Sequence, residues 1–549
     1  MAANPAAAAQ PRMIADAIAQ TLKAYGARWA FGIPGNDVLE TLRACEEQGI
    51  EFVLGKCEPS CAFMADAVYQ LTGKPAVLIP ALGPGISNAM SGIAGAQQER
   101  SAMVVLCGEM ATRQIGIYNH QVFDHVALAR PVTKYAETLN PKRAAQQLAK
   151  ALDIALEYPA GPVFLNIPAD LNREPAGEQA ARSPARRAQV ALTAAAASAL
   201  RARLALSKRP LALVGRGALL QDVPAALERF IDAWRMPFLT TYKAKGIADD
   251  RHPLSAGSVG LSPVVDAENL ELIAQADCLV LVGFDPIELR DAWLDAWPES
   301  LAVVTIDWAA LNHRIIPLGE EALGHVPSIL GQLLPDGTAA SAAAWSGERI
   351  LAHRARVLNI VRPRSPASGI SPAALFAAVS ARATPDWIMT VDVGAHRILA
   401  NHVIECRVPG QLMQSNGLGC MGYAVPAAIA AQLVHPDRPV VAMLGDGCML
   451  MTQGELALAQ ERGLPIVVVV LNDASLSLIK LKQSKMKLAN RAVDFGVPDF
   501  AKVAEGFGAH GVRVGRIEDF DAALAEALAA RRFTLIDALV DPSEYWDQM

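Results

Sequence analysis

Two groups of polar residues near the C-terminal end of the chain have the types and spacing to bind a metal ion. Asp446 lies between Gly445 and Gly447, directly after the apolar run PVVAML, and Asn472 and Asp473 follow the next apolar run, IVVVVL. Each run is typical of a buried strand, and parallel strands end at one edge of a sheet, where open α/β folds bind ligands. We therefore expect the two carboxylates to converge.

The segment between the two runs is typical of a helix. In TQGE, Thr452 is followed three residues later by Glu455, which is the spacing of a capping box, and Gly463 and Pro465 end the pattern. This predicts a helix that begins at Thr452 with its free N–H groups at the same edge of the sheet. Oxygen ligands beside a helix N-terminus suit Mg²⁺, and glycines let a diphosphate approach the backbone. For GDG alone, an ordinary turn in which Asp446 only caps a helix is the alternative.

Short apolar runs alternate with helical patterns along most of the chain. This alternation predicts an α/β fold of three doubly wound domains with mostly parallel sheets. We expect an N-terminal domain over 1–175, a central domain over 190–340 and a C-terminal domain over 365–549. Residues 174–207, rich in Ala, Arg, Ser and Pro, indicate a linker that leads into a helix, and the Ala/Ser/Gly-rich segment 337–347 ends the central domain.

The composition excludes several classes of protein. The chain has 549 residues, a formal net charge of −6 and no long run of Lys or Arg, so we expect a small-molecule partner and no binding to nucleic acid or membranes. No apolar run reaches the roughly 20 residues of a membrane span, and the start MAANPAAAAQPRMI lacks the basic region of a signal peptide. Eight cysteines without zinc-like spacing favour reduced thiols in a cytoplasmic protein.

The GDG motif, followed by an apolar strand and Asn-Asp, resembles the thiamin diphosphate-binding motif. The resemblance extends over nearly the whole chain to the enzyme group that contains acetolactate synthases, pyruvate oxidases and benzoylformate decarboxylases. It implies three α/β domains, with thiamin diphosphate and Mg²⁺ as cofactors. The implied metal ligands are Asp446, Asp473 and the backbone carbonyl of Ser475, with Asn472 as the alternative to Asp473. The cofactor-binding residues implied at this motif are Gly445, Gly447 and Cys448.

The stretch CEPSCAFMADAVYQLTGKPAVLIPALGPGISN resembles the second motif of the family and places Glu58 at the position of its catalytic glutamate. In the family this carboxyl hydrogen-bonds the aminopyrimidine ring and promotes deprotonation of the thiazolium carbon, which requires a raised pKa in an apolar site. Taken alone, a Glu before a helix also fits a solvated capping residue. Cys57 replaces the usual His and ALGPG replaces TSGPG, and both changes bear on substrate specificity.

Two stretches of the C-terminal domain resemble further parts of the cofactor site. SNGLGCMGYAVPAAIAA aligns Met421 with the large apolar residue that bends the cofactor, and the carbonyl of Gly419 with the acceptor for the ring amino group. A Met here also fits an ordinary core position. DVGAH aligns Gly394 and His396 with a loop that touches the diphosphate.

Two stretches of the N-terminal domain resemble the substrate side of the site. GIPGND places Pro34, Gly35 and Asn36 near the aminopyrimidine and the substrate. NHQVFDHVALARPVTKY resembles acetolactate synthases, with His120 and Gln121 beside the reacting centre, where they would hydrogen-bond a carbonyl or relay a proton. His120 also fits a structural hydrogen-bonding role.

The expected substrate pocket departs from the family pattern after the metal motif. Leu476 and Ser477 replace a frequent Tyr-Gly pair, and Leu478 and Ile479 are expected to line an apolar pocket with Leu476. The lysine in the first loop of catabolic acetolactate synthases is missing from IPGNDVLETL, so acceptor binding is expected to differ. GRGALL is too short for a dinucleotide fingerprint, and we expect no flavin.

The resemblance implies a 2-oxo acid decarboxylase and carboligase, with acetolactate synthesis as the nearest named activity. Such an enzyme releases carbon dioxide and transfers the acyl-anion equivalent to a carbonyl acceptor. The first alternative is a non-oxidative decarboxylase or lyase of a bulkier or aromatic 2-oxo acid. The second is a non-catalytic paralogue that only binds the cofactor, against which Glu58 argues. In the family Glu58 and Asp446 come from different subunits, which implies a homodimer or homotetramer.

Overall fold

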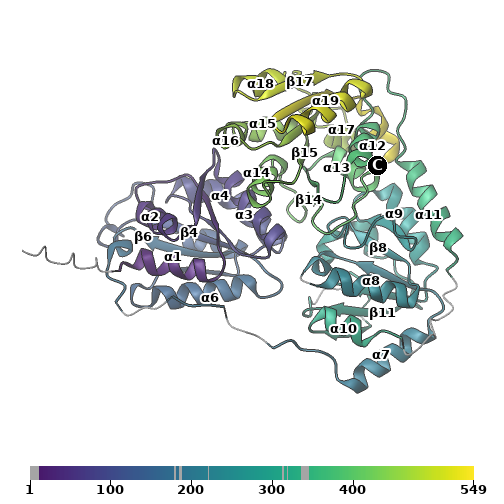
Figure 1. Cartoon of the computed structure of the whole chain (residues 1–549), viewed down its shortest axis with the longest axis horizontal. Coiled ribbons are helices and arrows are strands. Elements are labelled where there is room, and N and C mark those ends of the chain that lie inside the picture. The colour runs from purple at the N-terminus through teal and green to yellow at the C-terminus, as the bar shows by residue number, and fades with distance from the viewer. Residues whose placement is uncertain are drawn as a thin grey trace, which may run out of the picture. The chain divides into compact units, whose positions relative to one another are not determined.

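The computed structural model describes residues 12–177, 181–184, 188–220, 222–311, 315–317, 319–335 and 345–549. Within these residues the chain forms three sheets of six strands each (Figure 1), and every pairing between neighbouring strands is parallel. This confirms the predicted α/β class. The chain divides into two compact units, Met1–Arg186 and Arg187–Met549. The first 11 residues, and most of the predicted segment 337–347, lie outside the described residues.

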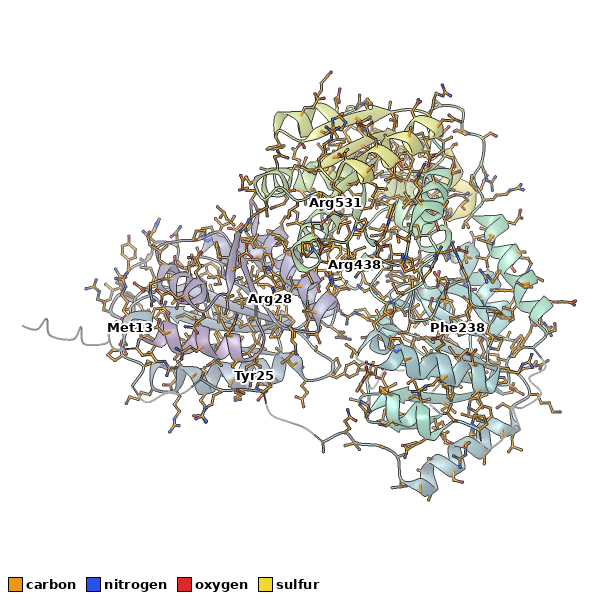
Figure 2. The ribbon with its side chains drawn as sticks, viewed as in Figure 1. Met13, Tyr25, Arg28, Phe238, Arg438 and Arg531 are labelled. Carbon is orange, nitrogen blue, oxygen red and sulfur yellow. The ribbon has the colours of Figure 1, made fainter. Side chains whose placement is uncertain are left out.

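The first unit contains the sheet with strand order β2-β1-β3-β4-β6-β5. Its strands are β1 (Trp29–Gly32), β2 (Glu51–Leu54), β3 (Ala76–Leu78), β4 (Met103–Glu109), β5 (Tyr135–Thr138) and β6 (Val163–Pro168). Its α-helices are α1 (Ile14–Ala24), α2 (Leu39–Glu47), α3 (Glu58–Thr72), α4 (Pro84–Gln98), α5 (His125–Ala129) and α6 (Ala144–Leu156). Tyr25, labelled in Figure 2, ties α1 to α6 because its hydroxyl donates to Asp153 Oδ1 at 2.9 Å.

The second unit contains the other two sheets. The central sheet has the order β12-β11-β10-β7-β8-β9, with β7 (Pro210–Val214), β8 (Phe238–Thr241), β9 (Ser255–Val259), β10 (Cys278–Val282), β11 (Ala302–Asp307) and β12 (Glu320–Leu323). Its helices are α7 (Ala194–Leu206), α8 (Val223–Trp234), α9 (Pro263–Ile273), α10 (Val326–Gln332) and α11 (Gly347–Ile360). Phe238, labelled in Figure 2, is fully buried in this core. The helix expected after the linker is α7.

The C-terminal sheet has the order β14-β13-β15-β16-β18-β17. Its strands are β13 (Ile388–Val391), β14 (Leu412–Gln414), β15 (Val440–Gly445), β16 (Val467–Asn472), β17 (His510–Val514) and β18 (Thr534–Leu539). The helices are α12 (Pro372–Arg382), α13 (Ala395–Val403), α14 (Ala424–Val434), α15 (Asp446–Thr452), α16 (Glu455–Glu461), α17 (Ser477–Lys485), α18 (Phe500–Gly506), α19 (Ile517–Ala530) and α20 (Tyr545–Gln548).

The first and the C-terminal sheets have the same strand order, counted from the first strand of each. In both sheets the first strand lies between the second and the third, so the direction in which the chain crosses the sheet reverses there. Open α/β sheets bind ligands in the crevice at such a point, outside the carboxyl ends of the strands. In the C-terminal sheet this crevice lies between β13 and β15, and in the first sheet it lies between β1 and β3.

The helix after β15 begins earlier than the sequence pattern indicates. It starts at Asp446, with Gly445 as the preceding cap residue, and α16 follows from Glu455. The predicted capping box is therefore wrong, since Thr452 ends α15 and its hydroxyl donates to the carbonyl of Cys448 at 3.1 Å. The physical reason is that the chain turns into the helix directly at the strand end, where Asp446 Oδ1 accepts the N–H of Gly447 at 2.6 Å.

No helix in the described part of the chain is long and apolar enough to cross a membrane.

Candidate active site

The structure brings Asp446 and Asp473 together at the carboxyl ends of β15 and β16. These strands are parallel neighbours, with Gly445 opposite Leu471. The Oδ2 atom of Asp446 accepts the backbone N–H of Asp473 at 3.0 Å and that of Ala474 at 2.6 Å. The expected convergence of the two carboxylates therefore follows from the pairing of their strands.

Burial makes ionisation of both carboxylates costly. Burial raises the pKa of Asp446 to about 7, and the charge of Asp473 adds to the rise. Burial also raises the pKa of Asp473 to about 6, although Ser477 Oγ and the N–H of Ser475 donate to its oxygens at 2.6 and 3.2 Å. A divalent cation bound between them would remove this cost, so the donor set fits a hard cation such as Mg²⁺.

The other two predicted metal ligands are placed differently. The amide of Asn472 donates to Asp537 Oδ1 at 2.9 Å and to the carbonyl of Pro498 at 3.0 Å, so its side chain is engaged beside β18. The hydroxyl of Ser475 donates to Asp494 Oδ1 at 2.9 Å, which is consistent with a ligand role for its backbone carbonyl only. Among the described residues no cluster of three or more His, Cys, Asp or Glu side chains could hold a metal. A cation here would therefore need backbone oxygens or oxygens of a bound diphosphate.

His396 lies against two glycines at the crevice between β13 and β15. A Cβ atom added to Gly394 would lie 2.6 Å from His396 Cε1, and one added to Gly445 would lie 3.3 Å from the same atom. Burial lowers the pKa of His396 to about 3, so the ring is neutral at pH 7. Its Nε2 atom is buried and has no hydrogen-bond partner in the described part of the chain. An unpartnered ring nitrogen in a cradle without Cβ atoms fits the diphosphate predicted here.

Met421 and Leu476 approach each other over Gly447. A Cβ atom added to Gly447 would lie 2.8 Å from Leu476 Cδ2 and 3.2 Å from Met421 Cε. Gly419 has φ +66, a conformation that favours glycine at the position predicted to present its carbonyl to the cofactor. The structure thus places two apolar side chains from separate loops beside the glycine that follows Asp446.

The other two predicted pocket residues lie in α17. The side chain of Leu478 packs against the hydrophobic core of this domain, and that of Ile479 is 44% exposed. Leu476 lies with Met421 at Gly447, and a pocket-lining role of Leu478 and Ile479 stays a prediction. The periodicity of a helix explains the difference, since successive residues point in different directions.

Asp392 is a residue that the sequence analysis did not assign to the site. It is fully buried at the end of β13, and its carboxylate accepts the N–H groups of Val393, Gly422 and Ala424 at 2.8, 3.0 and 2.9 Å. Burial raises its pKa. The carboxylate therefore joins the predicted diphosphate loop to the loop that carries Met421. Its position at the end of the strand WIMTV was the signal that could have identified it.

Cys448 also contributes to this loop arrangement. Its Sγ atom lies 3.3 Å from the carbonyl of Val393, to which it donates, and burial raises the pKa of the thiol. A neutral buried thiol packs and donates a weak hydrogen bond but is a poor nucleophile. Cys448 is thus placed beside the predicted cofactor loop in a structural role.

In the first unit Glu58 is the first residue of α3, and Asn88 of α4 holds its carboxylate. The amide of Asn88 donates to Glu58 Oε2 and lies 3.8 Å from Cys57 Sγ. The helices α3 and α4 approach closely because Gly92 has no side chain where it faces Ala62. This close approach lets Asn88, which the sequence analysis did not single out, reach Glu58.

The remaining predicted residues of the first unit lie in exposed loops after β1 and β4. Pro34 and Asn36 are exposed, and Gly35 lies between them. The exposed ring of His120 lies 6.2 Å from that of Tyr118. Gln121 is exposed and has φ +57, a left-handed conformation that is unusual for a residue other than glycine.

The crevice of the central sheet, between β7 and β10, is occupied by side chains of the chain itself. Glu288 accepts the N–H of Arg216 at 3.1 Å and the hydroxyl of Thr241 at 2.6 Å. The indole N–H of Trp308 donates to the carbonyl of Gly217 at 3.0 Å. These contacts join the segments at the carboxyl ends of β7, β8, β10 and β11.

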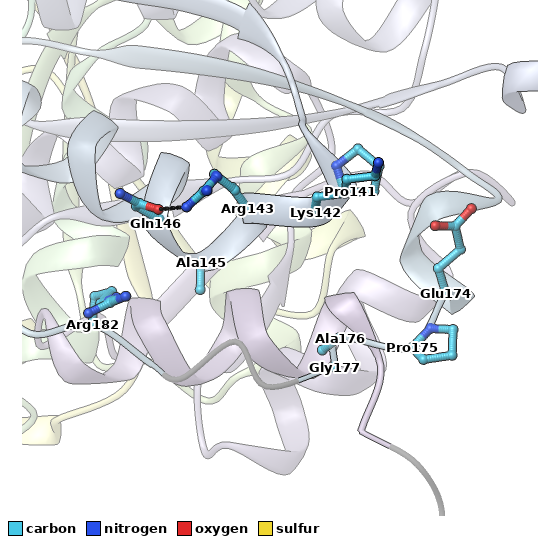
Figure 3. Close-up of a pocket in the computed structure, with 10 residues that line it drawn as sticks. All are labelled: Pro141, Lys142, Arg143, Ala145, Gln146, Glu174, Pro175, Ala176, Gly177 and Arg182. Carbon is cyan, nitrogen blue, oxygen red and sulfur yellow. Dashed lines mark hydrogen bonds between the residues drawn. The ribbon is translucent and has the colours of Figure 1, made fainter.

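A hollow of about 570 Å³ in the first unit is not lined by any predicted site residue. Figure 3 shows its lining, which includes Arg143 and Gln146, joined by a 3.0 Å hydrogen bond, and residues 174–177. The residues of the candidate site therefore do not coincide with this hollow.

Comparison with known proteins agrees with this architecture. The sequence matches three domain families: "Thiamine pyrophosphate enzyme, N-terminal TPP binding domain" over residues 12–128, the central domain over 197–333 and the C-terminal TPP binding domain over 392–538. Thiamine pyrophosphate is another name for thiamin diphosphate. The chain belongs to the thiamine pyrophosphate enzyme family.

Among its curated relatives are several acetolactate synthases. The chain is 30% identical to the acetolactate synthase of Bacillus subtilis (strain 168), over 96% of this chain and 93% of that protein. It is 30% identical to the catabolic acetolactate synthase of Raoultella terrigena, over 94% and 92% of the two chains. It is 28% identical to the acetolactate synthase isozyme 1 large subunit of Escherichia coli (strain K12), over 96% and 94%.

Proposed function

We propose that the chain is a Mg²⁺-dependent 2-oxo acid decarboxylase and carboligase of the acetolactate synthase type. The observation that carries the proposal is the pair Asp446 and Asp473, which lies beside the glycine cradle of His396. The near full-length similarity to acetolactate synthases supports the choice of reaction. When bound, thiamin diphosphate supplies the nucleophilic carbon that adds to a 2-oxo acid and carries the negative charge left after carbon dioxide departs.

The residues of the second unit would bind and orient the cofactor. Asp446 and Asp473 would hold the cation, and His396 and the backbone at Gly445 would hold the diphosphate. Met421 and Leu476 place apolar surface beside Gly447, which excludes water from the reacting carbon. Asp392 joins the loop after β13 to the loop that carries Met421, because its carboxylate accepts N–H groups from both.

The residues of the first unit would handle protons and the substrate. Glu58 would hold and release a proton at Oε1, because Asn88 already donates to Oε2. Gln121 and His120 donate hydrogen bonds to the carbonyl of the bound substrate and hold it in position. Pro34, Gly35 and Asn36 line the substrate side of the site.

We further propose that the active form is a homodimer or homotetramer in which Glu58 and Asp446 of one site come from different subunits. Exposed apolar side chains near both halves of the site support this assembly, since large exposed apolar patches mark interaction surfaces. Ile117 is 81% exposed in the loop that carries His120 and Gln121, and Met451 is 62% exposed in α15. The other exposed apolar residues of these regions are Tyr118, Val122, Phe123, Leu418 and Leu450.

A cytoplasmic location is also proposed, because the eight cysteines lie in the described residues as thiols, and reduced thiols are typical of that compartment. The expectation that no flavin is needed stays a prediction.

A non-oxidative decarboxylase of a bulkier 2-oxo acid is the second candidate. The observation that favours it is Leu476, whose side chain adds apolar surface beside Met421 at the expected reacting centre.

Product analysis tests both proposals. The purified full-length chain would be incubated with Mg²⁺, thiamin diphosphate and either pyruvate, 2-oxobutyrate or benzoylformate. Acetolactate or its homologue from the aliphatic acids supports the carboligase, and a free aldehyde from benzoylformate supports the second candidate. Carbon dioxide release from none of the three would overturn both.

A further inference from the structure

The crevice of the first sheet, between β1 and β3, is filled by polar side chains of the chain itself. Asp37 Oδ2 accepts the N–H of Leu82 at 2.8 Å, and His125 Nε2 accepts the N–H of Gly83 at 3.2 Å. These two consecutive amides form the turn that leads into α4. The C-terminal sheet has the same strand order, and its corresponding crevice carries the proposed cofactor site. The crevice of the first sheet therefore contains polar side chains of the chain, whereas that of the C-terminal sheet carries the proposed cofactor site.

A contact at the Nδ1 atom of His125 holds its ring in one orientation. It is 1% exposed, and its Nδ1 lies 3.1 Å from Glu109 Oε2. Because Nε2 accepts from Gly83, the ring proton lies on Nδ1 and is donated to Glu109. Glu109 also accepts from Asn166 Nδ2 at 2.6 Å and from the N–H of Met110 at 2.7 Å. Burial raises the pKa of Glu109, but these hydrogen bonds outweigh it and hold the pKa below its usual value.

Asp37 occupies a space that two glycines leave open. The carboxylate of Asp37 lies where a side chain of Gly35 or Gly108 would have to be, so a side chain at either position would displace it. Burial raises the pKa of Asp37, while the N–H of Leu82 lowers it. Asp37 directly follows Asn36, which is one of the predicted substrate residues.

The turn at Gly83 is in contact with Gln121. A Cβ atom added to Gly83 would lie 2.7 Å from Gln121 Cβ and 2.8 Å from its carbonyl oxygen. Gln121 has φ +57, a left-handed conformation that is strained in a residue other than glycine and that neighbouring contacts must maintain. His125 is the first residue of α5 and follows Gln121 by four residues in the chain. The imidazole that accepts the amide of Gly83 thus also anchors the segment that carries Gln121.

We propose that Asp37 and His125, with Glu109 behind the imidazole, are positioning residues that hold Gln121 in place to bind the substrate carbonyl. This inference rests on the role proposed for Gln121. The positioning residues act through the Leu82–Gly83 turn, so their removal should weaken substrate capture and leave cofactor binding unchanged. A purely structural role would instead lower stability without a selective effect on the substrate.

Paired variants of the full-length chain test the proposal. His125→Ala and Asp37→Ala remove the acceptor, whereas His125→Gln and Asp37→Asn keep an amide oxygen that can accept the same N–H. We expect the alanine variants to raise KM about tenfold, with kcat and the Kd of thiamin diphosphate changed less than about threefold. The amide variants should recover most of the loss. His353→Ala is the matched control, because His353 is a buried histidine in α11 whose Nε2 lies 3.1 Å from Asn269 Oδ1.

Two further measurements separate this inference from the proposed function. Amide hydrogen exchange of the peptide that contains Leu82 and Gly83 should become faster in the alanine variants and stay slow in the amide variants. Combined with Gln121→Ala, which should itself raise KM, His125→Ala should add less than about twofold, because the two residues act as one unit.

The results of these experiments distinguish failure of the role proposed for Gln121 from failure of the positioning role. If Gln121→Ala leaves KM unchanged, the proposed role of Gln121 fails. If Gln121→Ala raises KM but neither His125→Ala nor Asp37→Ala does, only the positioning role is overturned. The positioning role would also be overturned if the amide variants raised KM as much as the alanine variants and amide hydrogen exchange at the Leu82–Gly83 turn did not change. If His125→Ala does not fold, the Asp37 pair decides.

Discussion

Replacing Asp446 with Asn should stabilise the metal-free protein at pH 8 and remove its stabilisation by Mg²⁺ and thiamin diphosphate. Burial, together with the charge of Asp473, raises the pKa of Asp446 from 3.8 to about 7. When the folded state raises the pKa of an acid, ionisation opposes folding. The cost is absent below the unfolded pKa, grows as the pH rises between the two values and is complete above the folded pKa.

The size of the effect follows from this shift. About 3 pKa units at ~1.4 kcal/mol each correspond to about 4 kcal/mol in the free energy of unfolding at pH 8, and to roughly a third of that at pH 5. The Asn variant also loses part of the hydrogen bonding that the N–H groups of Gly447, Asp473 and Ala474 make to the carboxylate. That loss is about 1 to 2 kcal/mol. We therefore expect a net gain of about 2 kcal/mol at pH 8 and about none at pH 5.

Urea denaturation of the full-length chain at both pH values, with and without the two cofactors, measures this prediction. Ligands present at about 100 times their Kd should stabilise the parent protein by ~2.7 kcal/mol and the variant by almost nothing. Asp519→Asn, an exposed position in α19, is the control for loss of one charge. The prediction is wrong if the variant gains the same free energy of unfolding at pH 5 and pH 8, or if the cofactors stabilise both proteins equally.

Three further predictions concern single residues. Glu58→Gln should keep the Kd of thiamin diphosphate within about threefold and lower kcat at least about 100-fold, because an amide cannot exchange the proton; cofactor titration and product assays measure the two effects. Asn88→Ala should lower kcat about tenfold in the same product assay, with Tm nearly unchanged, since it frees one oxygen of Glu58. Gly447→Ala should raise the cofactor Kd at least about tenfold in a titration, because its methyl group would meet Leu476 and Met421.

Each of these predictions has a result that contradicts it. Full activity of Glu58→Gln would remove the proposed proton exchange, and an unchanged kcat in Asn88→Ala would mean that its hydrogen bond does not matter. Gly496→Ala is the control for Gly447→Ala, because a Cβ atom at Gly496 meets nothing within 4 Å. Equal cofactor affinity in these two variants would argue against a tightly packed site at Gly447.

The convergence of Asp446 and Asp473 could be predicted because its information is local. The runs before Asp446 and Asp473 are long enough to be recognised as strands, and parallel strands connected by a helix must end at the same edge. The capping box failed for an equally local reason, since Thr452 has the right spacing but the chain already turns into a helix at Asp446. The spacing of Thr452 and Glu455 alone cannot show that the helix starts earlier, directly after the strand.

The amino-acid sequence by itself determined the α/β class, the acids at the strand ends and the motif at Glu58, because strand runs, turns and helix starts depend on neighbouring residues. Only the tertiary structure decided which side chains support these groups. Asp392 accepts amides from a loop thirty residues away, Asn88 reaches Glu58 across two helices, and His125 joins Gly83 to Glu109. These contacts depend on the order of strands in the sheet and on helix spacing, and no local pattern encodes either.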